Sequence, residues 1–481
     1  MRVYHRFFLG GEWRVPTGQE SIEVISPATE EVVGRAPSAS KDDAAEAVRC
    51  AREAFDSGPW PRMSVKERIA AVAALADAIQ ERADEFADVL CTEQGLPLHT
   101  LHAGQVAKAV GTYRAYTEIA EDVDWVDTRV GTGGRVLHVR RVPVGVVTAI
   151  VPWNAPLFVA AMKLAPALVA GNTVVLKPPV ETPLHTYVFG EAVRAAGLPP
   201  GTVNIVPAEP EVSALLVRHP GVDKVSFTGS TAVGRQVSAV CGAELKRCTL
   251  ELGGKSAAIV LDDFERTAVN IKMLVAGVMT NAGQVCAAQT RVLVPRSCYS
   301  EVVDAMADVT RSLTVGDPRS PKTDIGPLIS RRHRDRVERY ISIGVQEGAS
   351  LVAGGGRPDL DRGWYVQPTV FSNVDNRMTI AREEIFGPVA AVLPYDHEDE
   401  AVAMANDSDF GLAGAVWTAD TERGEMVARQ IRTGSVAINS PSALDVYGPF
   451  GGFKQSGIGR EGGPEGLAAY TDYQTILQAR Q

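Results

Sequence analysis

The sequence has few cysteines, and none of them lie in CxxC pairs. Six cysteines are spread over 481 residues. Disulfide frameworks and zinc sites both use cysteines at close, recurring spacings, so the pattern predicts neither. It is typical of reduced thiols in a cytoplasmic protein, and we expect no bound metal.

Long apolar runs are also missing. The most apolar stretch, residues 156–171, is interrupted by Lys163 and Pro166. It is shorter than the ~20 residues that a membrane-spanning helix needs. Near the N-terminus, the apolar run 7–9 is too short for the core of a secretory signal. We therefore expect a soluble, cytoplasmic protein with no membrane partner.

A surplus of positive charge is absent as well. The chain carries 48 Lys and Arg against 58 Asp and Glu, which gives a formal net charge of -10. Nucleic-acid binding needs a basic surface that neutralises phosphates, so we expect no nucleic-acid partner and favour small-molecule ligands. With 45% hydrophobic and 22% charged residues, the composition is that of an ordinary multidomain globular protein.

The pattern of the chain changes near residue 140. Residues 43–95 carry apolar residues at helical spacing, and Ser64 with Glu67 forms a capping box at one helix start. Beyond residue 140, short β-branched runs alternate with small residues and helical patterns. This alternation predicts βαβ units and a mostly parallel sheet, which is an α/β fold.

Two further segments suggest how the rest is organised. A second α/β pattern begins after residue 255 and runs to about residue 440, which predicts a separate domain. Residues 125–145 contain two alternating runs around a glycine-rich turn. They predict a hairpin that projects from the body and serves assembly.

One cysteine stands in unusual surroundings. The stretch NAGQVCAAQT, residues 281–290, places Cys286 among alanines, a glycine and unbranched amides. A structural cysteine is usually surrounded by larger apolar side chains, whereas a nucleophilic sulfur needs space for a carbonyl group and a free N–H beside it. These neighbours favour a nucleophile, and we expect the other cysteines to be inert.

Two polar residues are candidates to assist such a nucleophile. Glu251, in LELGGKSAAIV, is a candidate for the base that activates water to release an acyl group from the cysteine. Asn154, in VPWNAPL, is a candidate to donate its amide to an oxyanion, with the Cys286 N–H as the second donor. Taken alone, Glu251 is better explained as a surface or salt-bridged carboxylate and Asn154 as a turn former.

Glycine-rich segments give two candidate phosphate loops. GSTAVG, residues 229–234, follows a strand-like run and opens a helix, so its amides would face a diphosphate. It lacks the Lys-Ser/Thr ending of a nucleoside-triphosphate loop, and a simple tight turn explains it equally well. GIGREG, residues 457–462, fits GxGxxG, but no strand is predicted before it, and we interpret it as a chance match.

Seven motifs occur along the chain in one order: PWN, LKP, FTGS, ELGGK, GQVC, EEIFGP and FGGFKQSG. Together they resemble the aldehyde dehydrogenase superfamily over nearly the whole chain. The resemblance implies a Rossmann-like dinucleotide-binding domain, a second α/β catalytic domain and a small β oligomerisation hairpin. The implied boundaries are 1–122 with 143–252 for the first domain, 253–440 for the second, 123–142 with 463–481 for oligomerisation, and 441–462 for a return segment that lines the substrate tunnel.

The resemblance also implies the roles of single residues. Cys286 would be the nucleophile, Glu251 the general base, and Asn154 a donor of the oxyanion hole. Lys177, grouped with the catalytic residues, would meet the adenosine ribose. Trp153 would form the adenine-side wall, Ser230 would meet the diphosphate, and Glu384 with Phe386 would meet the nicotinamide ribose and ring. The full implied cofactor set is Ile150, Pro152, Trp153, Lys177, Gly229, Ser230, Val233, Gly234, Gly253, Glu384 and Phe386.

The implied reaction is oxidation of an aldehyde to the acid with NAD, through a thioester on the cysteine, in a homodimer or homotetramer. Apolar residues are expected along the tunnel and favour a medium-chain or aromatic aldehyde: Phe158, Met162, Val285, Leu444 and Phe450. Three alternatives stay open. They are a cysteine hydrolase using Cys286, Glu251 and Lys177, a CoA-acylating dehydrogenase, and a non-catalytic member of the family.

The cofactor preference depends on the residues after Lys177. Three positions on, where NAD-preferring relatives often carry a glutamate that binds the ribose hydroxyls, this chain has Val180. Glu181 follows and, on an extended segment, would point to the opposite face. The loss removes repulsion of a 2′-phosphate without adding an arginine. We therefore expect NAD to be the acceptor and NADP to be tolerated, with about 10- to 100-fold discrimination.

Overall fold

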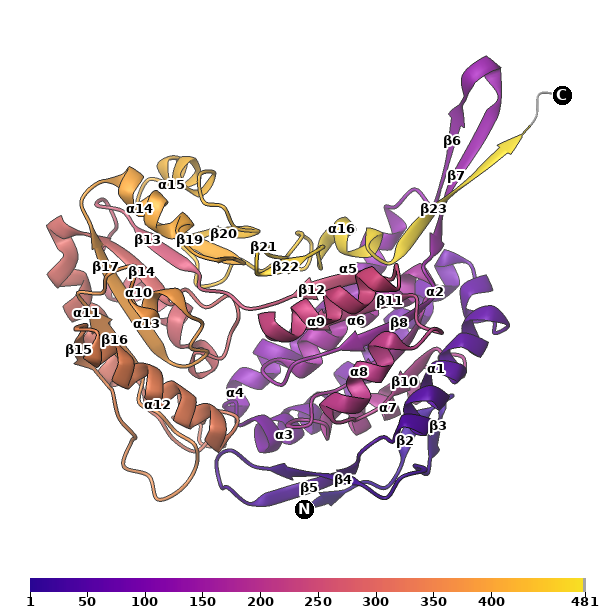
Figure 1. Cartoon of the computed structure of the whole chain (residues 1–481), viewed down its shortest axis with the longest axis horizontal. Coiled ribbons are helices and arrows are strands. Elements are labelled where there is room, and N and C mark those ends of the chain that lie inside the picture. The colour runs from indigo at the N-terminus through magenta and orange to yellow at the C-terminus, as the bar shows by residue number, and fades with distance from the viewer. Residues whose placement is uncertain (479–481) are drawn as a thin grey trace.

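The computed structural model describes residues 1–478, so the last three residues of the predicted oligomerisation segment 463–481 lie outside it. Two large sheets, each covered by helices, lie side by side, and a ribbon of strands projects from one of them (Figure 1). The predicted α/β fold class is confirmed. No helix among the described residues is long and apolar enough to cross a bilayer.

The first sheet has eight strands in the order β22-β12-β11-β8-β9-β10-β2-β3. Its five central strands, β12 to β10, run parallel, as the predicted βαβ units require. The strands are β2 (Phe7–Leu9), β3 (Glu12–Arg14), β8 (Val146–Ile150), β9 (Thr173–Lys177), β10 (Val203–Ile205), β11 (Lys224–Thr228), β12 (Arg247–Glu251) and β22 (Gly457–Ile458).

Helices surround this sheet. They are α1 (Lys41–Asp56), α2 (Val65–Glu81), α3 (Ala83–Gln94), α4 (Leu98–Leu101), α5 (Ala107–Glu121), α6 (Pro156–Ala170), α7 (His185–Ala195), α8 (Pro210–Arg218) and α9 (Thr231–Ala243). Of these, α1, α6, α7 and α9 pack on its strands, and the others pack mainly on helices. Ser64 and Glu67 form the predicted capping box at the start of α2. A π-helical turn (His102–Val106) joins α4 to α5.

The second sheet has seven strands in the order β15-β16-β17-β14-β13-β19-β20, and all but β15 run parallel to their neighbours. The strands are β13 (Ala257–Val260), β14 (Arg291–Pro295), β15 (Ser350–Ala353), β16 (Thr369–Ser372), β17 (Val389–Tyr395), β19 (Ala413–Trp417) and β20 (Ser435–Ile438). The helices around it are α10 (Ala268–Met279), α11 (Tyr299–Ser312), α12 (Arg331–Gln346), α13 (Thr379–Arg382), α14 (Glu398–Asn406) and α15 (Thr421–Ala428).

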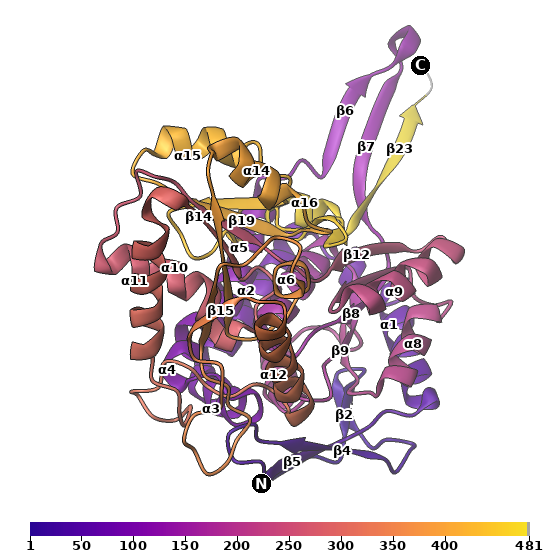
Figure 2. The same cartoon turned by 60° about the vertical axis from the view of Figure 1, so that its left-hand side comes forward.

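The predicted hairpin is present and projects from the body in both views (Figures 1 and 2). β6 (Val126–Val130) and β7 (Val136–Pro143) pair antiparallel, and the C-terminal strand β23 (Thr471–Gln478) pairs along the other side of β7. Apolar side chains on this ribbon stay exposed, including Val130 at 85% and Tyr473 at 64%. Exposed apolar side chains on a projecting sheet are typical of a surface that another chain covers.

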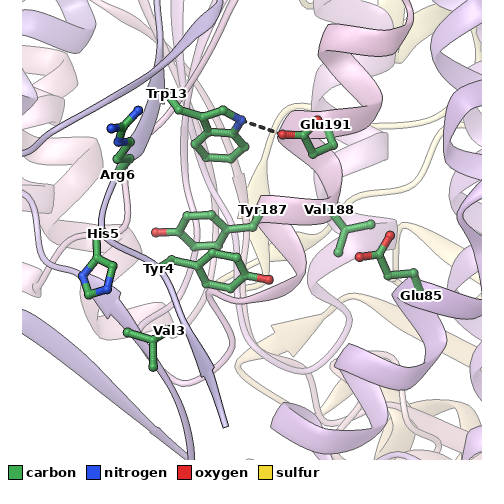
Figure 3. Close-up of a pocket in the computed structure, with 9 residues that line it drawn as sticks. All are labelled: Val3, Tyr4, His5, Arg6, Trp13, Glu85, Tyr187, Val188 and Glu191. Carbon is green, nitrogen blue, oxygen red and sulfur yellow. Dashed lines mark hydrogen bonds between the residues drawn. The ribbon is translucent and has the colours of Figure 1, made fainter.

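The N-terminal segment is held to α7 by stacked aromatic rings. Tyr187 lies between Tyr4 and Trp13, with ring centroids 3.7 and 5.3 Å away (Figure 3). The indole of Trp13 donates to Glu191 at 2.7 Å. Nearby, β1 (Arg2–Val3), β4 (Ser21–Ile25) and β5 (Val32–Pro37) form a small sheet of their own. The cavity of about 400 Å³ beside these rings contains none of the candidate catalytic residues.

After β20 the chain returns from the second sheet to the first. β21 (Phe453–Lys454) and α16 (Gly463–Ala468) lie on this part of the chain, whereas β18 (Phe410–Gly411) precedes β19. β21 pairs with β18 beside the second sheet, and β22 pairs with β12 in the first. The return segment therefore runs along both sheets, next to the end of β12.

Candidate active site

Several predicted residues lie at the carboxyl ends of the parallel strands of the first sheet. Ile150 at the end of β8 pairs in register with Lys177 at the end of β9. Thr228 at the end of β11 pairs with Glu251 at the end of β12. In open α/β sheets, ligands bind at this edge, because successive loops leave a crevice there. The sheet therefore brings candidate cofactor and catalytic residues, far apart in the sequence, to one edge.

Glu251 is buried, at 4% exposure, and neither of its carboxylate oxygens has a hydrogen-bond partner among the described residues. The salt-bridged alternative is therefore wrong. Burial raises the pKa of this carboxyl well above its usual value, and the charge of Glu461 raises it further. A buried carboxyl with no fixed partner and a raised pKa is suited to exchange protons near neutral pH.

The loop that carries Cys286 has an irregular backbone. Asn281 and Ala282 both have positive φ angles of 53°. This conformation costs a residue with a β-carbon roughly 1–2 kcal/mol. Gln284 stabilises the loop, because its side chain accepts from the N–H of Ile329 at 3.0 Å and donates to the carbonyl of Asn281 at 3.1 Å. The glutamine of the GQVC motif therefore holds the turn that leads to the cysteine.

Cys286 keeps part of its surface exposed, as a nucleophile must. The ELGGK motif touches it directly: a β-carbon on Gly254 would lie 2.3 Å from the main-chain carbonyl oxygen of Cys286. Only glycine fits there. Burial of the sulfur raises the pKa of the thiol to about 12, and the charges of Glu384 and Glu251 add to the rise. The thiol is therefore protonated at neutral pH and needs a base.

Asn154 joins the nucleophile loop to the first sheet. Its side-chain amide donates to the main-chain carbonyl of Gln284 at 2.9 Å, two residues before Cys286. The amide nitrogen carries a second hydrogen that this contact does not use. Asn154 is thus more than a turn former, because it reaches across to the segment whose backbone N–H was predicted as its partner donor.

The turn between β11 and α9 has the features of a diphosphate loop. Ser230 caps α9 by accepting from the N–H of Val233 at 3.4 Å. A β-carbon on Gly234 would lie 2.3 Å from Leu252, so glycine lets the helix pack closely on the segment after β12. Val233 lies on the first turn of α9 and is 43% exposed, so its apolar side chain is free to contact a ring of a bound ligand. A helix N-terminus at a sheet edge suits an anion.

Glu384 lies between this edge and the nucleophile. Its carboxylate accepts from the N–H of Gly254 at 3.0 Å. A β-carbon on Gly253 would come within 2.5 Å of the same carboxylate. Burial raises the pKa of Glu384. The predicted ribose-binding glutamate therefore contacts the segment that supports Cys286.

Trp153 does not lie where we expected relative to Phe386. The two rings meet edge to face with centroids 5.4 Å apart, and His333 packs against both. The adenine and the nicotinamide are at opposite ends of a dinucleotide, so residues in contact cannot serve one end each. The two predicted roles therefore cannot both hold, and the end of the cofactor that Trp153 faces stays a prediction.

Lys177 and Glu181 also lie differently from the expectation. Residues 180–182 bend rather than continue extended from β9. As a result, the Glu181 carboxylate is close enough to raise the pKa of Lys177, whereas burial lowers that pKa to about 8 overall. Burial raises the pKa of Glu181. The opposite-face prediction for Glu181 assumed an extended segment, and the structure has a bend there instead.

Residues 13–476 match the model of the aldehyde dehydrogenase family. The chain belongs to this family. The predicted superfamily and enzyme class are thereby confirmed: the protein is an aldehyde dehydrogenase, and so an oxidoreductase that acts on aldehydes.

Similar proteins cover the dehydrogenase from end to end. Geranial dehydrogenase of Castellaniella defragrans is 45% identical, with 99% of both chains covered. An aldehyde dehydrogenase of Mycobacterium tuberculosis, solved with NAD+, is 49% identical with a TM-score of 0.97 and 99% of both chains covered. A variant of aldehyde dehydrogenase C of Pseudomonas syringae, solved with NAD+ and octanal, is 40% identical with a TM-score of 0.94, covering 98% of this chain and 96% of that one.

One residue of the dehydrogenase site was missed in the sequence. Glu461, in the GIGREG segment, is buried at 4% exposure and pairs with Lys163 Nζ at 2.6 Å. Ser226 on β11 accepts from the same ammonium at 3.2 Å. Lys163 is the charge that interrupts the apolar run of α6, which was the only signal in the sequence. The pair lies near enough to Glu251 to change its pKa.

Two of the predicted tunnel residues lie on the side of α6 that faces α5. Lys108 Nζ is 5.9 Å from the ring centroid of Phe158, and the Thr112 hydroxyl is 4.0 Å from the sulfur of Met162. Met162 and Phe450 are buried, at 2% and 6% exposure. Val285 immediately precedes Cys286. These contacts place apolar side chains on α6 and on the nucleophile loop.

Proposed function

We propose that this protein oxidises an apolar aldehyde to the carboxylic acid with NAD as the acceptor, through a thioester on Cys286. One observation carries the hydrolytic form of the reaction: Glu251 is a buried carboxyl with no fixed partner, beside a cysteine whose pKa its charge raises. An acyl group on a cysteine is released to water only if a base takes the proton of that water. Glu251 is that base.

The Cys286 sulfur attacks the aldehyde carbon. Because burial holds the pKa of the thiol at about 12, its proton must leave as the sulfur attacks. Because Cys286 is partly exposed, water accepts that proton. In the second half of the reaction the Glu251 carboxylate accepts a proton from the attacking water. Splitting the oxidation into formation and hydrolysis of an acyl enzyme replaces one difficult step by two easier ones.

Asn154 and the backbone N–H of Cys286 bind the oxyanion that forms when the sulfur attacks. One hydrogen of the Asn154 amide is held by Gln284 and the other is free for the oxyanion. Hydride leaves a tetrahedral carbon only when the oxygen on it carries the negative charge, so fixed donors at this position lower the barrier. Alignment of the donors before the reaction is what makes them effective.

The residues at the sheet edge fit NAD. The amides from Gly229 to Gly234 and the start of α9 suit the diphosphate, Lys177 and Glu181 suit the adenosine ribose, and Glu384 suits the nicotinamide ribose. Trp153 and Phe386 form a wall beside the nicotinamide ribose. Bound NAD supplies the hydride acceptor. Ile150, Pro152, Val233 and Gly253 complete the proposed set of cofactor residues.

The proposed substrate is a medium-chain or aromatic aldehyde. Phe158, Met162, Val285, Leu444 and Phe450 give the tunnel an apolar lining, which binds a chain or ring through the hydrophobic effect. Two relatives are consistent with such a substrate, because one is named for geranial and another was solved with octanal. A panel of aldehydes of increasing length, ranked by kcat/KM, measures the preference.

We also propose the domain division given above, a homodimer or homotetramer, and a cytoplasmic location. The exposed apolar side chains on β6, β7 and β23 support assembly through this ribbon. Six free cysteines suit a reducing compartment. Light scattering of the intact chain, and of a Val130→Glu variant that charges the ribbon, tests the assembly.

The deciding experiment is to mix enzyme, aldehyde and NAD and to follow NADH and acid together. The proposal expects one NADH for each acid and no dependence of the rate on coenzyme A. Acid without NADH would support a cysteine hydrolase instead. A requirement for coenzyme A would support an acylating enzyme, and no turnover of any aldehyde a non-catalytic protein.

A further inference from the structure

A line of buried side-chain amides runs from the π-helical turn to Asn154. Gln105 Nε2 donates to Gln94 Oε1 at 2.6 Å, and Gln94 Nε2 donates to the main-chain carbonyl of Asn154 at 2.5 Å. Both glutamines are only 2% exposed. Gln94 is the last residue of α3, so the line joins two helices to the segment after β8.

The same carbonyl is held from a second direction. Asn281 Nδ2 donates to the main-chain oxygen of Asn154 at 3.0 Å and lies 3.3 Å from the carbonyl of Gln284. Gln284 in turn accepts from the side chain of Asn154. The backbone and the side chain of Asn154 are thus both fixed, the backbone by Gln94 and Asn281 and the side chain by Gln284.

Stability alone does not explain the two glutamines. Burying an amide costs free energy unless all its hydrogen bonds are formed, and the Gln105 carbonyl oxygen has no partner among the described residues. Gln105 lies in the π-helical turn His102–Val106, a backbone form that is rare and often found at functional sites. Within residues 1–478, Gln105 therefore has both an unpaired buried oxygen and a rare backbone conformation, and it is the residue that orients Gln94.

We propose that Gln94 and Gln105 are positioning residues for the oxyanion hole. They hold the peptide plane of Asn154, so that the free hydrogen of its side-chain amide points at the oxygen of the reacting aldehyde. The inference rests on the proposed role of Asn154 as an oxyanion donor. Neither glutamine is proposed to touch substrate or cofactor, since both act through the Asn154 carbonyl.

The expected effect is on kcat rather than on binding. A misplacement of about 1 Å in a catalytic group costs up to about 100-fold in rate. We expect Gln94→Met, which keeps the length of the side chain and removes the amide, to lower kcat between about 10- and 100-fold. Gln105→Met leaves the direct contact of Gln94 in place and should lower kcat less. KM for aldehyde and for NAD should stay within about twofold for both.

A double-mutant cycle with Asn154→Ala separates positioning from general destabilisation. That variant alone should lose about 100- to 1,000-fold in kcat, as expected for one oxyanion donor. Adding Gln94→Met to it should cost nothing more, because the amide that Gln94 aims is already gone. Asn204→Leu, which removes another buried amide in β10, is the control: it should lower the Tm without lowering kcat.

The outcomes distinguish this inference from the proposed function. If Asn154→Ala lowers kcat and Gln94→Met does not, or if their losses add, the positioning role is wrong and the oxyanion role stands. If Asn154→Ala leaves kcat unchanged, the oxyanion assignment fails and the positioning role fails with it. Should Gln94→Met not fold, Gln105→Met enters the same cycle, with the same non-additive result expected.

Discussion

The side-chain amide of Asn154 donates to the main-chain carbonyl of Gln284 at 2.9 Å, which ties the segment after β8 to the nucleophile loop. The contact links the two large sheets of the molecule at the point where Cys286 lies. The contact thereby fixes the two proposed oxyanion donors, the Asn154 amide and the backbone N–H of Cys286, relative to each other.

Cys286→Ser should abolish both the dehydrogenase activity and any hydrolysis of a p-nitrophenyl ester. An alcohol is a far weaker nucleophile than a thiol, and no histidine is assigned to activate it. Both rates are measured on protein checked for folding by its Tm. Cys298→Ser is the matched control and should keep full activity, since the Cys298 sulfur is buried against the Pro295 carbonyl. More than a few per cent of residual activity in Cys286→Ser would contradict the nucleophile assignment.

Glu251→Gln should form the acyl enzyme and then stall. The amide cannot take a proton from water, so each active site should release about one NADH in a burst, followed by little turnover. Stopped-flow measurement of NADH gives the burst, and mass spectrometry of the quenched protein gives the acyl adduct. Normal steady-state turnover in this variant would place the base elsewhere. A missing burst would mean that Glu251 is also needed to take the thiol proton.

The rate should fall as the pH is lowered, with a midpoint well above the ordinary glutamate value of 4.5. Burial and the charge of Glu461 raise the pKa of Glu251, so the carboxylate form that acts as a base is lost while the pH is still far above that value. The profile of kcat against pH measures the midpoint.

Glu461→Gln removes one cause of this rise and leaves the Lys163 charge in place, so the acid limb should move to lower pH. Glu465→Gln is the control: this carboxylate lies on α16 in the same segment and is not among the groups that shift the pKa of Glu251. If the acid limb of the kcat profile does not move in Glu461→Gln, another group limits the rate at low pH.

Glu181 should set the cofactor preference. The bend at residues 180–182 brings its carboxylate near Lys177, where it repels a 2′-phosphate. We therefore expect the preference for NAD to exceed the 10- to 100-fold range predicted from Val180 alone, and Glu181→Gln to bring it into that range, roughly 1.4 to 2.8 kcal/mol. The measurement is kcat/KM for NAD and NADP at saturating aldehyde.

Glu209→Gln is the control for general charge, because Glu209 also raises the pKa of Lys177. Equal shifts in both variants would show that net charge, rather than contact with the ribose, decides the preference. A wild-type preference of only about 10- to 100-fold would show that Glu181 does not exclude the phosphate.

The sequence predicts the fold class, the capping box at Ser64, the projecting hairpin and the family, because each depends on local periodicity or on the order of motifs. Cys286, Glu251 and Asn154 stand in motifs whose neighbours are small or turn-forming, and this is a local signal too. The structure brings all three to one place, but their catalytic roles stay predictions.

The features that could not be predicted from the sequence depend on contacts between residues that are far apart in the chain. Glu461 pairs with Lys163, 298 positions earlier, and the charge of Lys163 within an apolar run is the only local sign of the pair. Trp153 adjoins Asn154 in sequence, but only the structure shows that its ring packs against Phe386. The segment before Glu181 was interpreted as extended, whereas residues 180–182 bend. In each case the direction of a side chain was not contained in the local pattern.

The crossing from the first sheet to the second, residues 252–256, is short. Glu251 adjoins it in sequence, and Gly254 within it lies against the backbone of Cys286. One brief stretch of chain therefore fixes the spacing of the proposed base and the proposed nucleophile, so a change in its backbone would disturb both together.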